Sequence, residues 1–218
     1  MTAALIDIQA RVHECERPGM LEAAAQLREC LASASGSASA FDVKLTFAPA
    51  DEAPENLAAS TVFVLSLLPE LDRPDEPVAD TAKRWTRTVQ ALREAGSPVY
   101  VRNVFRHVQE RTRDGRPTPV LDRIRRLDRM LVTASSQTGC AVIDIDRAFA
   151  DIGARELGTD YRMGGPLAAM LAGHTTVLSF LSHGMDDIVD PAVQEKAKSL
   201  HGRLRDARTL IQHRNSSK

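Results

Sequence analysis

Residues 140–174 read CAVIDIDRAFADIGARELGTDYRMGGPLAAMLAGH, and this stretch decides the fold of the chain. It begins with a short apolar run that ends in Asp144 and Asp146, as a buried strand does where it leaves a sheet. A loop then leads to Asp160, and a helix of small and apolar residues follows. The last unit of an open α/β sheet is usually a strand, followed by a loop that carries carboxylates and by a helix that covers the sheet. The stretch therefore also locates a candidate ligand site outside the end of the last strand.

Extended and helical patterns alternate along the rest of the chain. The nearly continuous apolar run at 61–68 predicts a central strand, and the strict alternation at 41–47 predicts a half-buried or edge strand. Residues 98–104 and 141–145 predict two further strands, whereas residues 3–8 fit either a first strand or the start of a helix. Apolar residues at helical spacing predict helices at about 18–31, 78–95, 120–133, 167–181 and 191–213.

This alternation predicts an α/β protein, a three-layer α/β/α sandwich of flavodoxin-like type with a parallel sheet of four to five strands. The chain has 218 residues, of which 43% are hydrophobic, so it can bury one sizeable core. We therefore expect a single domain over residues 1–218, with a C-terminal helix at about 191–213. Ligands of such sheets bind at the carboxyl ends of the strands. The predicted ends lie at 49, 66–69, 102–106 and 144–147.

Composition and charge narrow the classes of partner. The formal net charge is −1, which predicts neither a nucleic-acid partner nor a membrane partner. The three cysteines, Cys15, Cys30 and Cys140, are widely spaced, which favours reduced thiols in a cytoplasmic protein over disulfides or a zinc site. The N-terminus has no signal-peptide pattern, and no window approaches ~18 uninterrupted apolar residues. No glycine-rich nucleotide-binding motif is present, so we expect no cofactor.

The order of these patterns, with a last strand that ends V-I-D and an Asp just before a small-residue helix, resembles the SGNH (GDSL-type) hydrolase family. The resemblance covers about residues 61–181. It implies the three-layer sandwich and a site made of three sequence blocks. These are a Ser in a G-D-S turn after the first strand, a G-x-N-D block that donates to the oxyanion, and a late D-x-x-H block that supplies the orienting Asp and the base.

The catalytic blocks of that family are degenerate in this chain. The first strand candidate ends I-D-I-Q, so Asp7 stands where the G-D-S block would begin, and no Ser follows. Residues 66–70 read S-L-L-P-E in place of G-x-N-D. Asp160 of the late block is retained, but Met163 stands where the His should be. Acyl transfer by this mechanism needs a nucleophile and a base. We therefore expect the hydrolytic activity of the family to be lost.

A displaced Ser–His–Asp set is the alternative. Its candidate catalytic residues are Ser66 at a strand end, Asp160, and His174 on the helix after Asp160. If the intervening residues are helical, the His174 ring lies ~15 Å or more from the Asp160 loop. The competing interpretation makes Ser66 a small core residue and His174 a helix residue bonded to a neighbouring segment. The displaced set predicts an active acyl ester or thioester hydrolase, or an acyltransferase.

Basic residues gather after the strand predicted at 98–104. Guanidinium groups bind carboxylate or phosphate through paired hydrogen bonds. This pattern predicts a binding or accessory protein for an anionic small molecule or for an acidic surface of a partner protein. In the competing interpretation, the arginines form a solvated loop that Glu110 and Asp114 partly neutralise. The candidate ligand-binding residues are Arg102, Asn103, Arg106, His107, Asp144 and Arg162, and Arg111, Arg113 and Arg116 extend the basic loop.

Asp144, Asp146 and Asp160 fit two interpretations. Side chains two positions apart on a strand point to the same side, and clustered carboxylates bind hard cations. Alternatively, Asp144 caps the turn that follows the strand, beside Arg147. We favour the capping role for Asp144 and expect no metal site.

Overall fold

The computed structural model describes residues 3–49, 60–108 and 118–202, and a five-stranded parallel sheet forms its centre. Each strand pairs in parallel with its neighbours in the order β2-β1-β3-β4-β5. This order reverses direction between β1 and β3, as in other doubly wound sheets. The prediction of an α/β fold with four to five parallel strands is confirmed. The strands are β1 (Ala4–Arg11), β2 (Phe41–Phe47), β3 (Thr61–Ser66), β4 (Val99–Arg102) and β5 (Ala141–Ile143).

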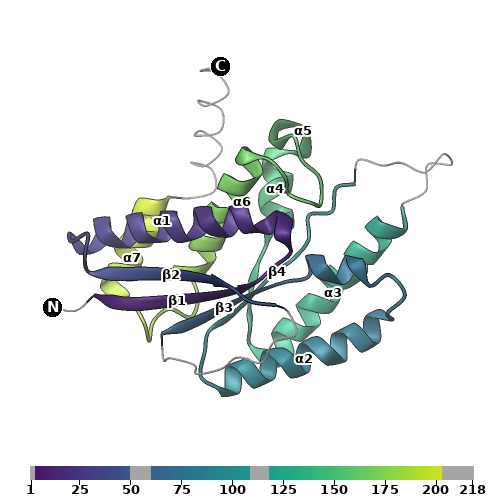
Figure 1. The fold of residues 1–218 in the computed structure, drawn as a ribbon, viewed down its shortest axis with the longest axis horizontal. Helices are drawn as coiled ribbons and strands as arrows, with labels where there is room; N and C mark the ends of the chain where they lie inside the picture. Colours follow the sequence, from purple (N-terminus) through teal and green to yellow (C-terminus); the bar gives the residue numbers. More distant parts are fainter. Residues whose placement is uncertain (1–2, 50–59, 109–117, 203–218) are drawn as a thin grey trace.

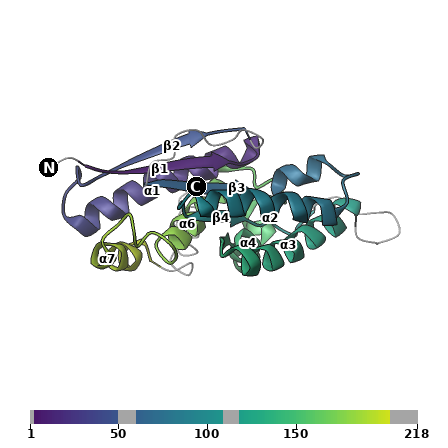
Figure 2. The same ribbon diagram turned by 90° about the horizontal axis from the view of Figure 1, so that it is seen from below.

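Helices cover the sheet in two layers (Figures 1 and 2). One layer contains α1 (Arg17–Ser35), α6 (Pro166–Phe180) and α7 (Pro191–His201). The other layer contains α2 (Val78–Glu94) and α3 (Pro119–Thr138), which pack against each other. The remaining helices are the short α4 (Ile145–Ile152) and α5 (Ala154–Leu157) and the 3₁₀ turns η1 (Glu14–Glu16) and η2 (Leu68–Asp72). No helix within the described ranges is long and apolar enough to span a membrane.

The burial of each strand explains its sequence pattern. All residues of β3 are buried, which accounts for its unbroken apolar run. On β2, Asp42 and Lys44 are exposed and Val43 is buried, as expected for an edge strand. The ambiguous segment at 3–8 belongs to a strand, and that strand continues to Arg11. It continues because β1 keeps pairing with β3 as far as Arg11 opposite Leu65.

The boundary between β5 and α4 differs from the prediction. The strand ends at Ile143, and the Oδ1 atom of Asp144 accepts a hydrogen bond of 3.1 Å from the backbone N of Arg147. Asp144 is therefore the N-cap of α4, which confirms its capping role. Asp146 lies in the first helical turn, so the expectation that Asp144 and Asp146 share one face of a strand is wrong. The helix predicted at 191–213 reaches His201, and the residues after 202 lie outside the described part.

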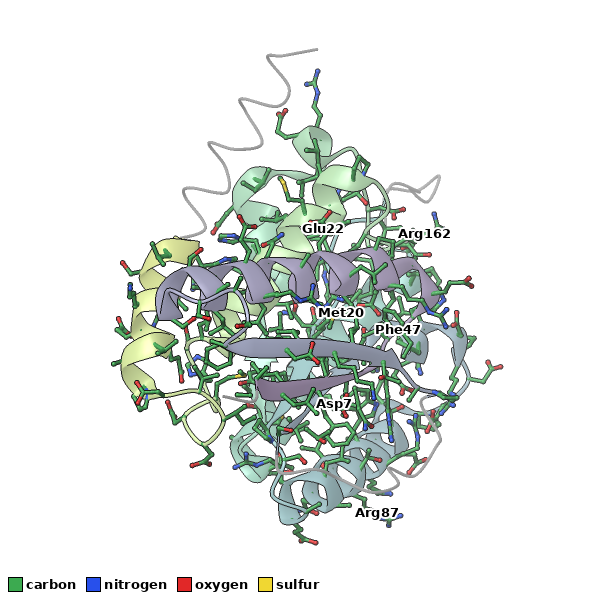
Figure 3. The ribbon with its side chains drawn as sticks, turned by 60° about the vertical axis from the view of Figure 1, so that its left-hand side comes forward. Asp7, Met20, Glu22, Phe47, Arg87 and Arg162 are labelled. Atoms are coloured by element: carbon green, nitrogen blue, oxygen red, sulfur yellow. The ribbon has the colours of Figure 1, made fainter. Side chains whose placement is uncertain are left out.

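The helices α1 and α6 cross at very short range. A Cβ atom on Gly173 would lie 2.7 Å from Cβ of Glu22 and 2.9 Å from the backbone N of Ala23. On the opposite helix, a Cβ atom on Gly19 would lie 3.0 Å from Cβ of Ala172. Figure 3 shows the fully buried side chain of Met20 between α1 and the sheet. The small residues of α6 thus let two helices approach closely over one face of the sheet.

Candidate functional site

The loops at the carboxyl ends of the strands meet at one edge of the sheet. The backbone N of Leu67, just after β3, donates to the O of Arg102 at the end of β4. The backbone N of Tyr161, in the loop before α6, donates to the O of His107. Because these bonds join segments far apart in sequence, the edge collects the candidate residues predicted after β3 and β4 and before α6.

Arg102 is the last residue of β4 and therefore lies at this edge of the sheet. Its side chain is 0% exposed, and Oε1 of Glu16 lies 3.5 Å from its Nη1. None of its three side-chain nitrogens has a hydrogen-bond partner among the described residues. Burial lowers the pKa of Arg102, and the charge of Glu16 opposes this effect. Buried polar groups are normally hydrogen-bonded, so this guanidinium group has donors to offer a ligand.

The loop after β1 carries an imidazole and a thiol side by side. The Nδ1 atom of His13 accepts a hydrogen bond of 3.3 Å from the backbone N of Cys15 and lies 3.0 Å from its Sγ. The Nε2 atom of the same ring lies 3.7 Å from Oδ2 of Asp72, which follows β3. Burial, with a further contribution from Glu16, raises the pKa of the Cys15 thiol to about 12. The thiol is therefore protonated at neutral pH.

The sequence prediction missed His13 and Cys15. It placed the nucleophile block of the resemblance at Asp7, but β1 continues to Arg11, so the loop that follows the strand begins only at Val12. This correction puts Cys15 in the loop where the resemblance implies a Ser. A His two residues before a Cys, just ahead of the helix start at Pro18, was the signal in the sequence.

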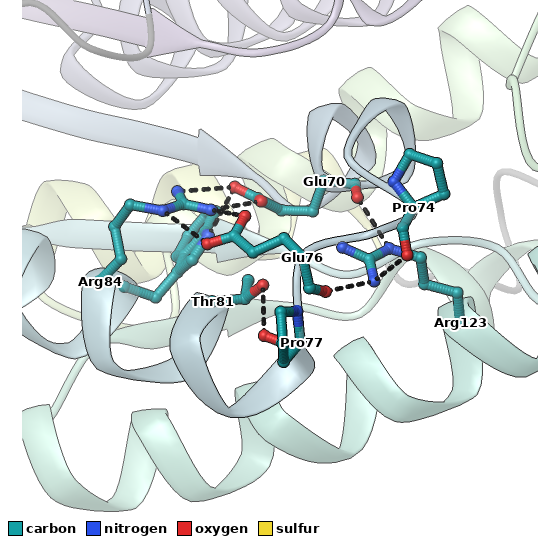
Figure 4. Close-up of polar contacts among 8 residues, drawn as sticks. Glu70, Pro74, Glu76, Pro77, Thr81, Arg84 and Arg123 are labelled. Atoms are coloured by element: carbon teal, nitrogen blue, oxygen red, sulfur yellow. Dashed lines mark hydrogen bonds and ion pairs between the residues drawn. The ribbon is translucent and has the colours of Figure 1, made fainter.

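A hydrogen-bonded network fixes the segment after β3 (Figure 4). The carboxylate of Glu70 is 6% exposed and accepts two bonds, of 3.0 and 2.6 Å, from Arg84. It also accepts a bond of 2.8 Å from Nε1 of Trp85, and Arg84 in turn bonds Glu76. Burial raises the pKa of Glu70, but the bonds from Arg84 and Trp85 outweigh it and hold that pKa below its ordinary value. The side chain of Arg123 donates to the backbone oxygens of Glu70 and Glu76, so η2 is tied to both helices of its layer.

The loop before α6 keeps the predicted Asp and replaces the predicted His. The carboxylate of Asp160 is 9% exposed, and it accepts bonds of 2.9 and 3.2 Å from the backbone N and Nη1 of Arg162. Its charge contributes to the raised pKa of Cys15, so both residues belong to the same edge. Met163 is buried and has a φ of 55°, a left-handed conformation that is uncommon outside glycine. It presents an apolar side chain where the resemblance implies a base.

The residues predicted to bind a ligand beyond β4 contact neighbouring side chains of the same edge. Asn103 donates a bond of 2.7 Å to Asp144 and accepts one of 3.0 Å from the backbone N of Asp146. Arg106 bonds Asp146 through its backbone N and its guanidinium group, with a shortest distance of 2.6 Å. The ring of His107 stacks on Phe105, with centroids 5.7 Å apart. The structure thus brings Asn103 and Asp144 together and places Arg106 beside Asp146. Arg111, Arg113 and Arg116 lie outside the described residues.

Ser66 and His174 occupy other surroundings. Ser66 is 3% exposed, and its Oγ accepts a bond of 3.0 Å from the backbone N of Leu68. His174 lies two turns into α6, ~12 Å along the helix axis from its start. Its ring stacks on that of His201 of α7, with centroids 4.1 Å apart. The structure therefore places His174 in the packing of α6 against α7 and does not bring it to Asp160. Among the described residues, no group of three or more His, Cys, Asp or Glu is arranged to hold a metal ion.

No protein-family profile matches the chain, and no curated protein matches it in sequence. Solved structures do match. The fold is similar to that of a predicted SGNH hydrolase from Slackia heliotrinireducens, at 14% identity and a TM-score of 0.51, over 82% of this chain and 100% of that one. It is also similar to an acetyl xylan esterase, at 10% identity and a TM-score of 0.55, over 78% of this chain and 98% of that one. At such identities the likeness concerns the fold alone, and the chain has an SGNH hydrolase-like fold.

Proposed function

We propose that this chain is a binding or accessory protein that holds an anionic small molecule at the carboxyl edge of its SGNH-like sheet. The observation that supports this proposal is the buried guanidinium group of Arg102. All of its nitrogens lack a hydrogen-bond partner among the described residues. A carboxylate or phosphate group, which accepts paired hydrogen bonds from a guanidinium group, is the matching ligand chemistry.

Glu16 balances the charge of Arg102 without satisfying its donors. A distance of 3.5 Å is longer than the usual ~2.7–3.2 Å of a hydrogen bond, and the Oε1 atom of Glu16 also has no partner in the described part. A buried charge with unmade hydrogen bonds costs several kcal/mol. An anion that binds Arg102 directly recovers these bonds, which gives the ligand a source of binding free energy.

The surface of the same edge presents two further arginines. The side chain of Arg106 is 55% exposed and pairs with Asp146, and that of Arg162 is 57% exposed and pairs with Asp160. Positive groups at the mouth of a site attract anions from solution and orient them. We expect an incoming anion to meet these residues before it reaches Arg102.

The family mechanism of ester hydrolysis has no His in the late block that normally supplies its base. Met163 stands in place of the His, and the thiol of Cys15 has a pKa of about 12 and remains protonated. The segment that replaces the G-x-N-D block places the buried apolar side chain of Leu68 after β3. These substitutions favour binding over Ser–His hydrolysis as the function of the site.

Isothermal titration calorimetry with inorganic phosphate, acetate and succinate tests the proposal. The informative variant is the double substitution Arg102→Met with Glu16→Gln, which removes both buried charges together and so leaves no unpaired ion. We expect the wild type to bind at least one probe and the double variant to bind it at least tenfold more weakly. Arg129→Met, on the exposed face of α3, is the matched control and should bind normally. Failure of the wild type to bind any probe, or equal binding by the double variant, would refute the anion site.

The displaced Ser–His–Asp set has its own test. A panel of p-nitrophenyl esters measures ester hydrolysis directly, and Ser66→Ala and His174→Ala remove the two candidate residues. The anion-binding proposal predicts that neither substitution changes the rate. Turnover that disappears in both variants would favour the hydrolase built on Ser66 and His174.

A further inference from the structure

We infer that Cys15 is a nucleophile that accepts an acyl group, with His13 as its general base. The donor belongs to the class of activated acyl compounds with an anionic part, such as acyl phosphates and thioesters. This inference rests on the proposed function, because Arg102 is the cationic group for both.

The geometry around Cys15 contains the parts that acyl transfer requires. The Nδ1 atom of His13 lies 3.0 Å from Sγ, within reach of the thiol proton. An imidazole whose Nδ1 accepts carries its proton on Nε2, the nitrogen that faces Asp72 at 3.7 Å. At this distance Asp72 makes no hydrogen bond, but its negative charge favours the proton on Nε2, so Asp72 is a positioning residue for the tautomer whose Nδ1 lone pair faces Cys15.

Arg102 supplies the electrostatic part of the centre. Its Nη1 atom lies 3.5 Å from Oε1 of Glu16, the residue after Cys15, and its charge opposes the burial that raises the pKa of the Cys15 thiol. When a sulfur atom attacks a carbonyl carbon, the carbonyl oxygen becomes negatively charged. A buried cation with unused N–H donors stabilises such an oxygen, and donors placed in this way contribute about 10²–10³-fold to the rate.

The three cysteines of the chain differ in these surroundings. Cys30 is buried in α1, where its Sγ donates to the O of Leu27 and burial raises its pKa to about 11. Cys140 is 4% exposed at the start of β5. Cys15 is half-buried and has the imidazole contact. A raised pKa does not prevent its reaction, because a general base removes the proton as the bond to carbon forms.

The reaction is balanced without a further reagent. Sγ of Cys15 bonds to the carbonyl carbon of the donor as its proton moves to Nδ1 of His13. The bond from carbon to the leaving phosphate or thiolate then breaks, and the leaving group takes the proton from His13. Water attacks the resulting thioester by the reverse proton transfers, which releases the acid and restores the thiol.

Intact-mass and peptide mass spectrometry of the full chain, incubated with acetyl phosphate or p-nitrophenyl acetate, tests this inference. We expect one acetyl group on the peptide that contains Cys15 and none on Cys30 or Cys140. The Cys15→Ser variant should lose the thioester adduct. Acetylation of Cys30 or Cys140 at an equal rate would show ordinary thiol reactivity and would overturn the inference.

The general base is tested by His13→Asn. Asn is a good N-cap, so this variant retains an acceptor for the backbone N of Cys15 while it removes the imidazole. We expect the same melting temperature as the wild type and a rate of acetylation about 100-fold lower. If His13 is the base, the pH dependence of the wild-type rate should differ from that of His13→Asn. An unchanged rate in the folded variant would rule out His13 as the base.

Asp72→Asn tests the positioning role, with Asp75→Asn on the same exposed segment as the matched control. We expect Asp72→Asn to slow acetylation about tenfold and to shift its pH profile, with normal rates in the control. Equal rates in both variants would remove Asp72 from the centre. Calorimetry of the wild type with the anionic probes tests the anion site separately from the acetylation of Cys15. Binding without acetylation of the wild type refutes this inference alone, and acetylation without anion binding refutes the proposed function alone.

Discussion

Asp128 of α3 uses only one of its two carboxylate oxygens. Its Oδ1 accepts a hydrogen bond of 3.1 Å from the backbone N of Val104, whereas Oδ2 is buried without a hydrogen-bond partner in the described part of the chain. Burial raises the pKa of Asp128 to about 7, and the charges of Asp146 and Asp144 add to this effect. The folded protein therefore holds this proton in a pH range where the unfolded chain has already released it.

This difference in proton binding sets the sign of a pH effect on stability. An Asp in an unfolded chain has a pKa of about 3.9, so wild-type stability should decline from about pH 4 to about pH 7. Asp128→Asn keeps the bond to Val104 and removes the ionisation. We expect this variant to match the wild type near pH 4 and to exceed it by about 1–3 kcal/mol at pH 8, measured by urea unfolding.

The control for this prediction is Asp122→Asn on the same helix. The side chain of Asp122 is 60% exposed and lies 3.7 Å from Arg126, so its loss should change stability by less than about 0.5 kcal/mol at either pH. Parallel pH profiles for the wild type and Asp128→Asn would show that the buried proton does not contribute.

At the scale of single residues, the sequence predicted those site residues that belong to a local motif. Asp160 and the missing base at Met163 were visible because their motif has a fixed short spacing. The spacing of His13 and Cys15 was visible, but it did not show that the pair lies at the site, because that depends on where β1 ends. That end is set by hydrogen bonding to β3, which lies about fifty residues away and has no local signature. For the same reason, no local pattern revealed that Arg102 is fully buried.

At the scale of elements, α1 and α6 cross so closely that no side chain fits between them at Gly173. Gly173 lies where its helix touches the backbone of α1, and a Cβ atom there would lie 2.9 Å from the backbone N of Ala23. Backbone atoms cannot move aside as a flexible side chain does. The two helices must therefore separate if any side chain is added at this position.

Gly173→Ala should destabilise the protein although Ala favours helices. The intrinsic gain from replacing Gly in a helix is about 1 kcal/mol, and overpacking in a core costs about 1–3 kcal/mol. The contact distance is so short that we expect the second effect to dominate, with a net loss of about 1–2 kcal/mol in urea unfolding. Ser199→Ala, at an exposed position of α7, is the control and should change stability by less than about 0.5 kcal/mol. A Gly173→Ala variant as stable as the wild type would mean that α1 and α6 do not pack as described.

Elements with long periodic patterns were predicted better than their boundaries. The helices α2 and α3 start and end within a few residues of the prediction, except that α3 runs on to Thr138. The change from β5 to α4 was misjudged because the apolar residues Ile143 and Ile145 fit a continuing strand equally well. The hydrogen bond from the backbone N of Arg147 to Asp144 marks the start of α4, and this bond exists only once the helix has formed.

At the scale of the whole molecule, the strands differ in how well the fold protects their backbone amides from hydrogen exchange. The residues of β3 are all buried and pair with β1 on one side and β4 on the other. The edge strand β2 pairs with β1, and its alternate residues are exposed. Exchange of backbone amide hydrogens requires local opening. The free energy of opening is higher for a strand that is buried on both faces and paired on both sides.

Hydrogen exchange measured by mass spectrometry should follow this order. We expect the peptide that covers Thr61–Ser66 to exchange most slowly and the peptide that covers Phe41–Phe47 to exchange at least tenfold faster. The difference between the two exchange rates should become smaller in denaturant, where exchange occurs through global unfolding. Equal protection of the two strands in buffer would contradict the place of β2 at the edge.

The overall architecture followed from the sequence because many weak patterns agreed on it. Alternating strands and helices admit few topologies, and the observed sheet order is one of them. The chemistry of the site did not follow in the same way, because it depends on contacts between loops. A fold tolerates changes at its strand ends far more readily than changes in its core.

The ring of His13 has one consequence for motion at the site. Its Nδ1 atom has a single lone pair, and that lone pair faces two donors, the backbone N–H of Cys15 and the thiol. Whenever the ring takes up the thiol proton, the lone pair is used and the bond from the backbone N of Cys15 is lost, while the bond from the backbone N of His13 to Glu16 remains. The short turn that carries Cys15 then keeps only one of its two capping bonds at the moment the sulfur becomes reactive. In this arrangement, a single proton decides both the state of the thiol and the hold on the turn that presents it.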